Sequence, residues 1–232
     1  MFQAFYGFDL AFAQCANALL KSAGVFFTPL LRGITFLGEL GWAFILAGLV
    51  MLCFRRTRKA GFAALLGIFL GAVFVNLILK NAVARPRPFH DESSPFYGFW
   101  VEAGSVSAGE YSFPSGHSTA TAAFAAALVC AFNKKTSWLY ALIPLVMGFS
   151  RIYFQVHFAS DVLFGFIAGG ACGVGAWFLE KLLTRWKLFE RFLEAGGVVD
   201  LVRKLKSRSA VTTDAPTETP PDGNNDEENQ NH

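Results

Sequence analysis

Long apolar stretches separated by short polar segments dominate the middle of the chain. Five predominantly apolar runs stand out, at residues 34–54, 61–79, 114–132, 138–149 and 162–179. An α-helix of about 20 apolar residues is long enough to cross the hydrocarbon core of a bilayer. The pattern therefore predicts a set of membrane-spanning helices joined by short polar loops.

Residues 2–32 follow a different pattern, in which apolar residues are interrupted by polar ones such as Asp9 and Asn17. Pro29 is expected to break the helical pattern, because proline lacks the N–H that a helix interior needs. We interpret segment 1–33 as an amphipathic helix that lies in the membrane interface. The alternative is a first full span, which would raise the predicted number of spans from five to six.

Basic residues gather in the segments that follow alternate apolar runs. They are Arg55, Arg56, Arg58 and Lys59 after the first run, Lys134 and Lys135 after the third, and Lys181, Arg185 and Lys187 after the last. Loops rich in lysine and arginine face the cytoplasm in membrane proteins. The charge pattern therefore predicts that the intervening segments, at residues 80–112 and 150–161, lie on the outer face.

Composition agrees with a membrane protein and disfavours two other classes. Hydrophobic residues make up 53% of the 232 residues, and the mean hydropathy is +0.41, which is too apolar for an average soluble domain. The net charge is only +3, so no nucleic acid partner is expected. The four cysteines are far apart and lack metal-ligand spacing, which favours neither a disulfide framework nor a zinc site.

The remaining segments complete the predicted domain organisation. A membrane domain covers residues 34–187, a juxtamembrane amphipathic segment covers 188–206, and a polar, acidic segment covers 207–232. The last segment has almost no apolar residues to bury, so it is expected to be disordered, on the cytoplasmic side. No basic stretch with a cleavage site precedes an apolar run at the start, so membrane insertion is expected to depend on the internal spans. The sequence does not indicate an oligomeric state.

The first candidate site is the stretch Pro114-Ser115-Gly116-His117, which opens the third apolar run. The Ser115 hydroxyl can cap the helix, and Gly116 lets the backbone approach a ligand closely. The N–H groups of a first helical turn attract an anion. His117 would then lie beside a bound phosphate, where an imidazole can donate or accept a proton near neutral pH.

A second candidate site joins two cations at the end of the second apolar run. Lys80 and Arg87 are seven residues apart, so they would share a face if the helix persisted. Prolines 86 and 88 are expected to stop that helix and to restrict the backbone around Arg87. A guanidinium in such a rigid setting is suited to bind phosphate through two hydrogen bonds.

The third candidate site contains Ser150-Arg151, His157 and Asp161. His157 and Asp161 are four residues apart and can face each other on a helix. A carboxylate that accepts from one imidazole nitrogen leaves the other as a nucleophile or base, so Asp161 favours His157 as the nucleophile. Cations, a helix N-terminus and two histidines on one side of the membrane suit phosphoryl transfer without a metal.

Together these residues resemble the three-part signature of the type-2 phosphatidic acid phosphatase family, which shares its site with vanadium-dependent haloperoxidases. The matching positions are Lys80, six residues, Arg87-Pro88; then Pro114-Ser115-Gly116-His117; then Ser150-Arg151, five residues, His157, three residues, Asp161. The resemblance covers Lys80 to Asp161 closely, and the helical pattern of residues 34–179 also agrees with it. The first 33 residues and the C-terminal segment are not covered.

The resemblance implies an all-α, polytopic membrane helical bundle of the acid phosphatase/vanadium haloperoxidase type, with no metal and no other cofactor. It also implies a role for each matching residue. His157 would attack phosphorus, Asp161 would orient it, and His117 would protonate the leaving oxygen and then activate water. Lys80, Arg87, Arg151, Ser115 and the N–H of Gly116 would hold the phosphate, with Pro88, Pro114 and Ser150 in supporting positions.

The sequence thus predicts an integral membrane lipid phosphatase whose partners are a phosphorylated lipid and the surrounding membrane lipids. The first expectation for the substrate is undecaprenyl diphosphate, with phosphatidic acid and phosphatidylglycerophosphate as alternatives. The expected location is a bacterial plasma membrane, with the site on the outer face. A vanadate haloperoxidase is disfavoured by the spans. A non-catalytic lipid-binding protein is disfavoured by the two histidines, which binding alone would not need.

Overall fold

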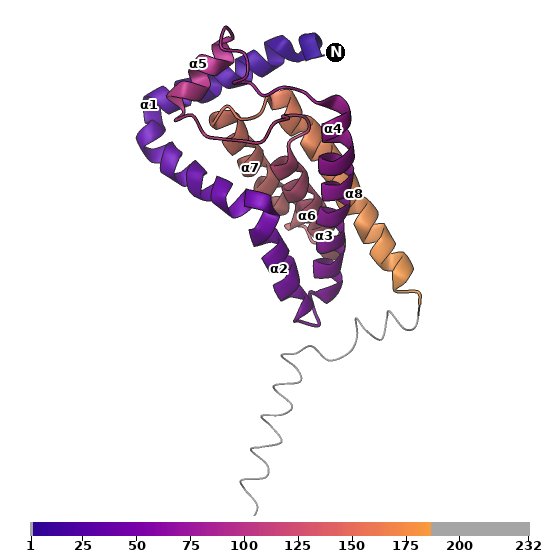
Figure 1. Ribbon diagram of the computed structural model, residues 1–232. Coiled ribbons are helices and arrows are strands. Elements are labelled where there is room, and N and C mark those ends of the chain that lie inside the picture. The colour runs from indigo at the N-terminus through magenta and orange to yellow at the C-terminus, as the bar shows by residue number, and fades with distance from the viewer. Residues whose placement is uncertain (1, 187–232) are drawn as a thin grey trace, which may run out of the picture.

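The computed structural model describes residues 2–186, and every regular element in that range is a helix (Figure 1). No strand is assigned in the described part, where an isolated bridge pairs Pro86 with Tyr111. These observations confirm the all-α prediction. The predicted segments 188–206 and 207–232 lie outside the described residues.

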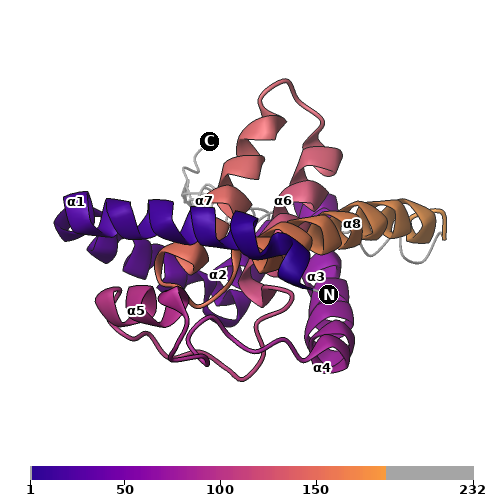
Figure 2. The ribbon, with the colours of Figure 1, turned by 90° about the horizontal axis from the view of Figure 1, so that it is seen from above.

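The chain begins with η1 (Phe2–Phe5) and the long helix α1 (Tyr6–Gly38). The first half of α1 lies across one end of the bundle, and the second half descends along it (Figures 1 and 2). The two halves meet at Ala23, whose φ of −140° and ψ of 21° are not helical. The predicted break at Pro29 is wrong, because Pro29 lies inside the helix. The direction changes instead at Ala23, and after it the Thr28 Oγ1 atom is hydrogen-bonded to the Tyr153 hydroxyl at 2.7 Å.

The predicted uninterrupted helix over residues 34–54 is also wrong. After α1 ends, a 3₁₀ turn, η2 (Glu39–Gly41), precedes α2 (Trp42–Leu52). Gly41 has a φ of +71°, in the left-handed region that glycine adopts without a steric penalty. This break turns the chain, so that the η2 backbone lies near the start of α6.

The second predicted span forms one continuous column of α3 (Arg58–Gly71), η3 (Ala72–Leu79) and α4 (Lys80–Val83). The middle part, η3, is a π-helix, a wider form that often occurs at functional sites. The column ends at Ala84, whose φ is 48°.

The remaining helices follow a loop at the same end of the bundle as the first half of α1 (Figure 1). They are α5 (Pro95–Glu102), α6 (Gly116–Phe132), η4 (Ser137–Ala141), α7 (Leu142–Tyr153) and α8 (Ala159–Leu183). Helix α6 occupies the centre and packs against α3, α7 and α8. Its contact with α3 is built mainly from small side chains, including Ala60, Ala63, Ala64 and Ala127.

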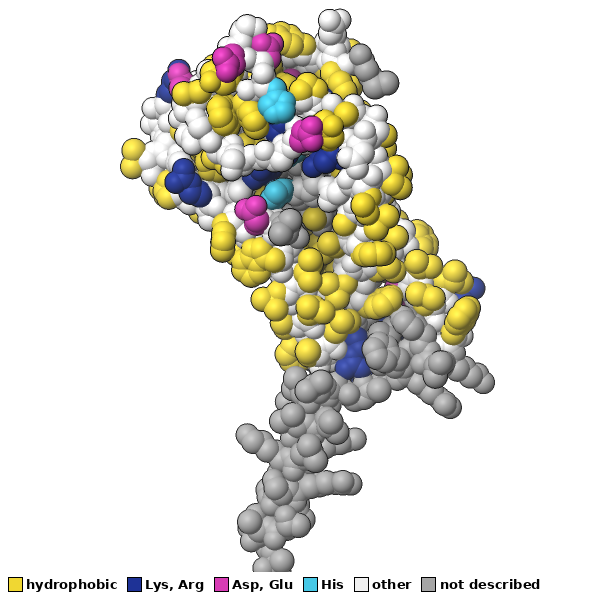
Figure 3. Space-filling model, viewed as in Figure 1, with side chains coloured by type: hydrophobic (Ala, Val, Ile, Leu, Met, Phe, Trp, Pro, Cys, Tyr) yellow, Lys and Arg dark blue, Asp and Glu magenta, His cyan; other side chains and the backbone are white. Residues whose placement is uncertain are grey.

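Three helical stretches are long and apolar enough to cross a membrane, namely Phe2–Gly38, Arg58–Val83 and Ala159–Leu183. Two shorter apolar helices, Trp42–Leu52 and Gly116–Phe132, lie beside them. Hydrophobic side chains cover most of the flank of the bundle, whereas charged side chains gather at the end that carries α5 (Figure 3). The fold is thus a membrane helical bundle, as the sequence predicts.

Glycines allow α8 to approach α6 closely. A Cβ atom built on Gly165 would lie 2.8 Å from the carbonyl oxygen of Ser115, and one on Gly173 would lie 2.9 Å from Ala126 Cβ. At Gly169 it would lie 2.9 Å from Ala122 Cβ. Gly-rich helices are expected to pack closely, and the structure confirms this on one face of α8.

We expect Gly169→Ala to destabilise the protein by about 1–3 kcal/mol, because the added methyl group overpacks the α6–α8 contact. The matched control is Gly170→Ala, since a Cβ at Gly170 meets nothing within 4 Å. Thermal unfolding in detergent checks the difference. Equal midpoints for the two variants would show that the α6–α8 contact is looser than described.

Candidate active site

A cavity of about 480 Å³ lies near the end of the bundle that carries charged residues. Its wall is built from the η2 turn, the η3–α4 column, residues 107–109, the start of α6 and the end of α7. Six of the residues that the sequence identifies line it: Lys80, Arg87, Gly116, His117, Arg151 and His157. The three separate stretches therefore meet around one space.

The start of α6 is capped by Ser115, as predicted. Its hydroxyl accepts from the backbone N–H of Ser118 at 3.4 Å and from the Ser118 hydroxyl at 2.9 Å. Ser115 does not line the cavity, so the structure gives it a capping contact and no direct path to a ligand. Gly116 does line it, and a Cβ there would lie 2.8 Å from Asn76 Oδ1. The absence of a side chain at Gly116 thus leaves room for Asn76 beside the cavity.

Lys80 and Arg87 reach the cavity without sharing a helix. The helix stops before Arg87, as predicted, because α4 ends at Val83 and Ala84 has a φ of 48°. Arg87 lies in the following loop, where Nη1 donates to the Val156 carbonyl at 2.6 Å and Nε donates to the Gly109 carbonyl at 2.5 Å. Burial lowers the pKa of Arg87 to about 10, which still leaves the guanidinium protonated at neutral pH.

His157 and Asp161 face each other, but they do not share a helix as expected. His157 precedes α8, whereas Asp161 lies in the first turn of that helix. There the Asp161 Oδ2 atom accepts from the Phe158 N–H at 2.9 Å, which helps to start the helix after His157. His157 Nδ1 lies 3.6 Å from the same Oδ2 atom.

The contact of Arg87 with His157 determines where the imidazole carries its proton. Arg87 Nη1 lies 3.2 Å from His157 Nε2. A guanidinium only donates hydrogen bonds, so Nε2 is the acceptor and the proton of the neutral ring is on Nδ1, toward Asp161. The unshared electron pair of Nε2 is therefore on the side of the ring that Arg87 contacts, as a nucleophile requires.

His157 is neutral at physiological pH in this setting. Burial lowers its pKa well below the usual value, and the nearby charges of Arg87, Arg151 and Lys80 lower it further. We expect the His157 ring to show no titration between about pH 5 and 8, the range in which an ordinary histidine changes charge. NMR of protein with labelled histidines checks this. A His157 midpoint near 6.5 would contradict the described burial.

Three buried polar atoms of cavity residues lack hydrogen-bond partners within residues 2–186. They are His117 Nε2, Arg151 Nε and His157 Nδ1, and the last of these lies 3.6 Å from Asp161 Oδ2. A buried polar group without a hydrogen-bond partner destabilises the folded protein. An anion bound in the cavity would supply the missing partner. The arrangement of Lys80, Arg87 and Arg151 around two imidazoles is suited to bind a phosphate and to transfer its phosphoryl group. Within the described range, no group of three or more His, Cys, Asp or Glu side chains is placed to hold a metal ion.

The three supporting positions have packing contacts. The Ser150 hydroxyl donates to the Met147 carbonyl at 2.6 Å and accepts from the Thr35 hydroxyl at 3.1 Å. Pro88 and Pro114 are buried. These contacts hold the end of α7, the Arg87 loop and the start of α6 in place.

Sequence reasoning missed four residues at or behind the cavity. Glu39 and Asn76 line it, whereas Asp9 and Arg85 form a buried cluster with Asp161. Asp9 and Asn76 lie in otherwise apolar stretches. A polar residue at membrane depth is usually functional, so this signal could have identified both.

Comparison with known protein families supports one assignment. The model of the PAP2 superfamily matches residues 60–185, the range from α3 to the end of α8. A decaprenylphosphoryl-5-phosphoribose phosphatase of Mycobacterium tuberculosis is 34% identical over 159 residues, which cover 68% of this chain and 81% of that protein. An undecaprenyl-diphosphatase of Sulfolobus acidocaldarius is 30% identical over 52% of this chain, which spans just over half (55%) of that protein's length.

A solved structure resembles the whole bundle. It is the crystal structure of a transmembrane PAP2-type phosphatidylglycerolphosphate phosphatase from Bacillus subtilis, with a TM-score of 0.52 and 25% sequence identity. The match covers 80% of this chain and all of that chain.

Proposed function

This chain belongs to the PAP2 superfamily, and from that premise we propose that it hydrolyses a lipid phosphate through a covalent phosphohistidine at His157. As a member of that superfamily it is a membrane lipid phosphatase. The observation that carries the proposal is the orientation of His157, whose Nε2 accepts from Arg87 while Nδ1 faces Asp161. The mechanism needs no metal.

In the first step, the phosphate binds among Lys80, Arg87 and Arg151, and His157 Nε2 attacks phosphorus. The negative charge of the bound phosphate favours a protonated His117 beside it. As the bond between phosphorus and the leaving oxygen breaks, His117 gives that oxygen its proton. The imidazole of His157 becomes positively charged as the N–P bond forms, and the negative charge of Asp161 stabilises it.

In the second step, water attacks the phosphorus of the phosphohistidine, and His117 accepts a proton from that water. The N–P bond breaks, inorganic phosphate leaves, and His157 returns to its neutral form. The two steps leave His117 protonated again, so the cycle needs no external acid or base.

For the substrate, we propose undecaprenyl diphosphate first. The name of the Sulfolobus relative supports this choice. Phosphatidylglycerophosphate and phosphatidic acid are the alternatives, and the name of the Bacillus structure supports the first of these two. The name of the Mycobacterium relative, a decaprenylphosphoryl-5-phosphoribose phosphatase, joins a polyprenyl lipid carrier to a phosphorylated sugar.

Phosphate release tests both the reaction class and the substrate. Purified protein in detergent receives each of the three lipids in the presence of excess chelator. Release that resists the chelator and disappears in His157→Ala supports the mechanism, and the relative rates rank the substrates. Hydrolysis of phosphatidic acid with no hydrolysis of undecaprenyl diphosphate would overturn the first choice of substrate.

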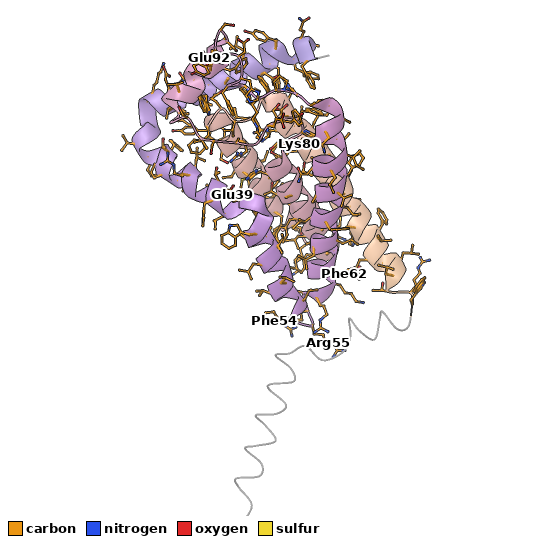
Figure 4. All side chains as sticks on the ribbon, in the orientation of Figure 1. Glu39, Phe54, Arg55, Phe62, Lys80 and Glu92 are labelled. Carbon is orange, nitrogen blue, oxygen red and sulfur yellow. The ribbon has the colours of Figure 1, made fainter. Side chains whose placement is uncertain are left out.

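One observation favours a monoester as the second candidate. Glu39, an exposed residue in the η2 turn, lines the same cavity as the cations, so its negative charge would lie near the second phosphate of a bound diphosphate. Figure 4 shows Glu39 at the junction of α1 and α2, with Lys80 on the neighbouring column. Like charges repel, so a carboxylate here disfavours a diphosphate and favours a headgroup with hydroxyl groups.

We expect Glu39→Gln to raise kcat/KM for undecaprenyl diphosphate about fivefold relative to phosphatidic acid, which corresponds to about 1 kcal/mol of relieved repulsion. Glutamine keeps the size of the side chain and removes only its charge. The measurement is the ratio of kcat/KM for the two lipids in the same micelles. A ratio equal to that of the unsubstituted protein would show that Glu39 does not face the second phosphate.

We also propose that the protein spans a bacterial plasma membrane and that its active site lies on the outer face. Arg55 lies at the end of the bundle opposite Lys80 (Figure 4), and basic loops favour the cytoplasmic side. The test introduces a single cysteine at Ser93 or at Arg56 in a variant without the four native cysteines. An impermeant maleimide should label the first in intact cells and the second only after lysis. The reverse pattern would invert the proposed orientation.

A further inference from the structure

Behind His157, one arginine joins two carboxylates in a buried cluster. Arg85 Nη1 lies 2.5 Å from Asp161 Oδ1, and Arg85 Nη2 lies 2.9 Å from Asp9 Oδ2. The exposed fractions are 6% for Arg85, 2% for Asp9 and 0% for Asp161. Asp9 comes from the first half of α1, which is outside the range that the family model matches.

We propose that Asp9 and Arg85 are positioning residues for phosphoryl transfer, which hold the Asp161 carboxylate against His157 and preserve its negative charge. This inference rests on the proposed function, in which His157 is the nucleophile. In this proposal α1 takes part in the reaction through Asp9, although none of the first 22 residues of α1 lines the catalytic cavity.

The hydrogen bonds of the cluster fix the orientation of the Asp161 carboxylate. Each oxygen of Asp161 has a separate partner: Oδ1 accepts from Arg85 Nη1, and Oδ2 accepts from the Phe158 N–H at 2.9 Å. The carboxylate therefore cannot rotate without losing a hydrogen bond. This orientation keeps Oδ2 at 3.6 Å from His157 Nδ1. At this distance the attraction between the carboxylate and the ring increases when the ring becomes positively charged.

The number of charges in the cluster also matters for His157. If Arg85 had Asp161 as its sole partner, the two charges would cancel, and little would remain to stabilise a cationic His157. Asp9 supplies a second carboxylate to the same guanidinium, so the three residues together carry one negative charge. That charge is buried beside the ring that must become positive during the attack on phosphorus.

Aromatic side chains also contact the cluster. The Arg85 guanidinium lies between two aromatic rings, 4.1 Å from the centroid of Phe2 and 3.8 Å from that of Phe158. Both rings attract the cation through their π-electrons, which adds to its attraction to the two carboxylates.

Asp9 is also tied to the start of α8. Its Oδ1 atom accepts from the Ser160 N–H at 2.7 Å, and its Oδ2 atom accepts from the Ser160 hydroxyl at 2.9 Å. The Ser160 hydroxyl in turn accepts from Arg85 Nη1 at 2.8 Å. The residue next to Asp161 is therefore held by the same cluster, so that a change at Asp9 reaches the His157–Asp161 contact directly.

Asp9→Asn tests the proposal because asparagine keeps the shape and one acceptor oxygen while it removes the charge. We expect kcat to fall about 10- to 100-fold, the range found when groups that orient a functional residue are removed. KM should stay within about twofold, since neither Asp9 nor Arg85 contacts the phosphate. Asp9→Glu keeps the charge and should recover part of the loss. The assays use undecaprenyl diphosphate and phosphatidic acid in detergent micelles, with the thermal midpoint recorded for each variant.

The matched control is Glu102→Gln, which weakens a different contact of α1. Glu102 accepts from Asn17 Nδ2 at 2.6 Å and pairs with Lys21 at 3.0 Å, and this contact joins α1 to α5 without reaching Asp161. We expect kcat of this variant to equal that of the unsubstituted protein. A drop like that of Asp9→Asn would overturn the proposal, because loosening α1 alone would then account for the effect.

Three further outcomes are decisive. An Asp9→Asn protein with an unchanged kcat, together with an inactive His157→Ala protein, would overturn this inference and leave the proposed function intact. An active His157→Ala protein would overturn the proposed function itself. If Asp9→Asn does not fold, Arg85→Lys replaces it, because a single ammonium group cannot bridge both carboxylates with the same geometry. An unchanged kcat in folded Arg85→Lys would also overturn the inference.

Discussion

His157→Ala is expected to reduce kcat on the order of 10⁵-fold, because loss of a covalent nucleophile removes the whole two-step route. Methyl replaces the imidazole, so Arg87, Arg151 and Lys80 still attract the phosphate, but no group can attack phosphorus. Binding should therefore persist while turnover disappears. Phosphate release and lipid binding, measured on the same preparation, check the two parts of this expectation.

Trapping of the intermediate separates the roles of the two histidines. His117→Ala should slow the attack of water more than the first attack if the substrate has a good leaving group, so labelled phosphate should accumulate on the protein. The label should be stable in alkali and labile in acid, as a phosphorus–nitrogen bond is, and it should be absent from His157→Ala. The matched control is His90→Ala, since His90 is an exposed histidine outside the cavity wall. A labelled His157→Ala protein would assign the nucleophile to another residue.

Arg151→Met is expected to lower kcat by about 10²- to 10³-fold, the effect of removing one preorganised donor from a charged transition state. Arg151 is buried near Arg87, and its Nε atom has no hydrogen-bond partner within the described residues. A buried cation beside other cations destabilises the folded protein. The thermal midpoint of Arg151→Met should therefore equal or exceed that of the unsubstituted protein.

The contrast with Arg87→Met makes this prediction specific. Arg87 donates to the carbonyls of Val156 and Gly109, so its loss should lower both kcat and the thermal midpoint. Unfolding is measured with and without inorganic phosphate, which should stabilise the unsubstituted protein more than Arg151→Met. A clear loss of stability in Arg151→Met without phosphate would show that its guanidinium has a structural partner.

The helices of the bundle could be predicted because their signal is local. Apolar runs of bilayer length need internal hydrogen bonds in lipid, and the α-helix satisfies them within one segment. The runs at 61–79 and 162–179 accordingly lie within the column from Arg58 to Val83 and within Ala159–Leu183. The local signal did not reveal the break at Glu39–Gly41, because nothing in an apolar pattern shows where tertiary contacts turn the chain.

The sequence likewise predicted some features of the candidate site and not others. Residue types and their spacing identified Lys80, Arg87, His117, Arg151 and His157, since phosphoryl transfer needs cations and imidazoles wherever it occurs. The spacing of His157 and Asp161 predicted that both lie on one continuous helix, and this prediction was wrong. Asp161 accepts from the Phe158 N–H and α8 begins only at Ala159, so the pair with His157 forms across the helix start.

By itself, therefore, the sequence determined the membrane helices and the chemistry that three short motifs can carry. Only the tertiary structure decided that Glu39 lines the same cavity and that Arg85 joins Asp161 to Asp9. Asp9 and Ser160 are 151 residues apart in the chain, yet they share hydrogen bonds. Such a contact follows from the packing of α1 across the end of the bundle, and no local pattern of residues specifies it.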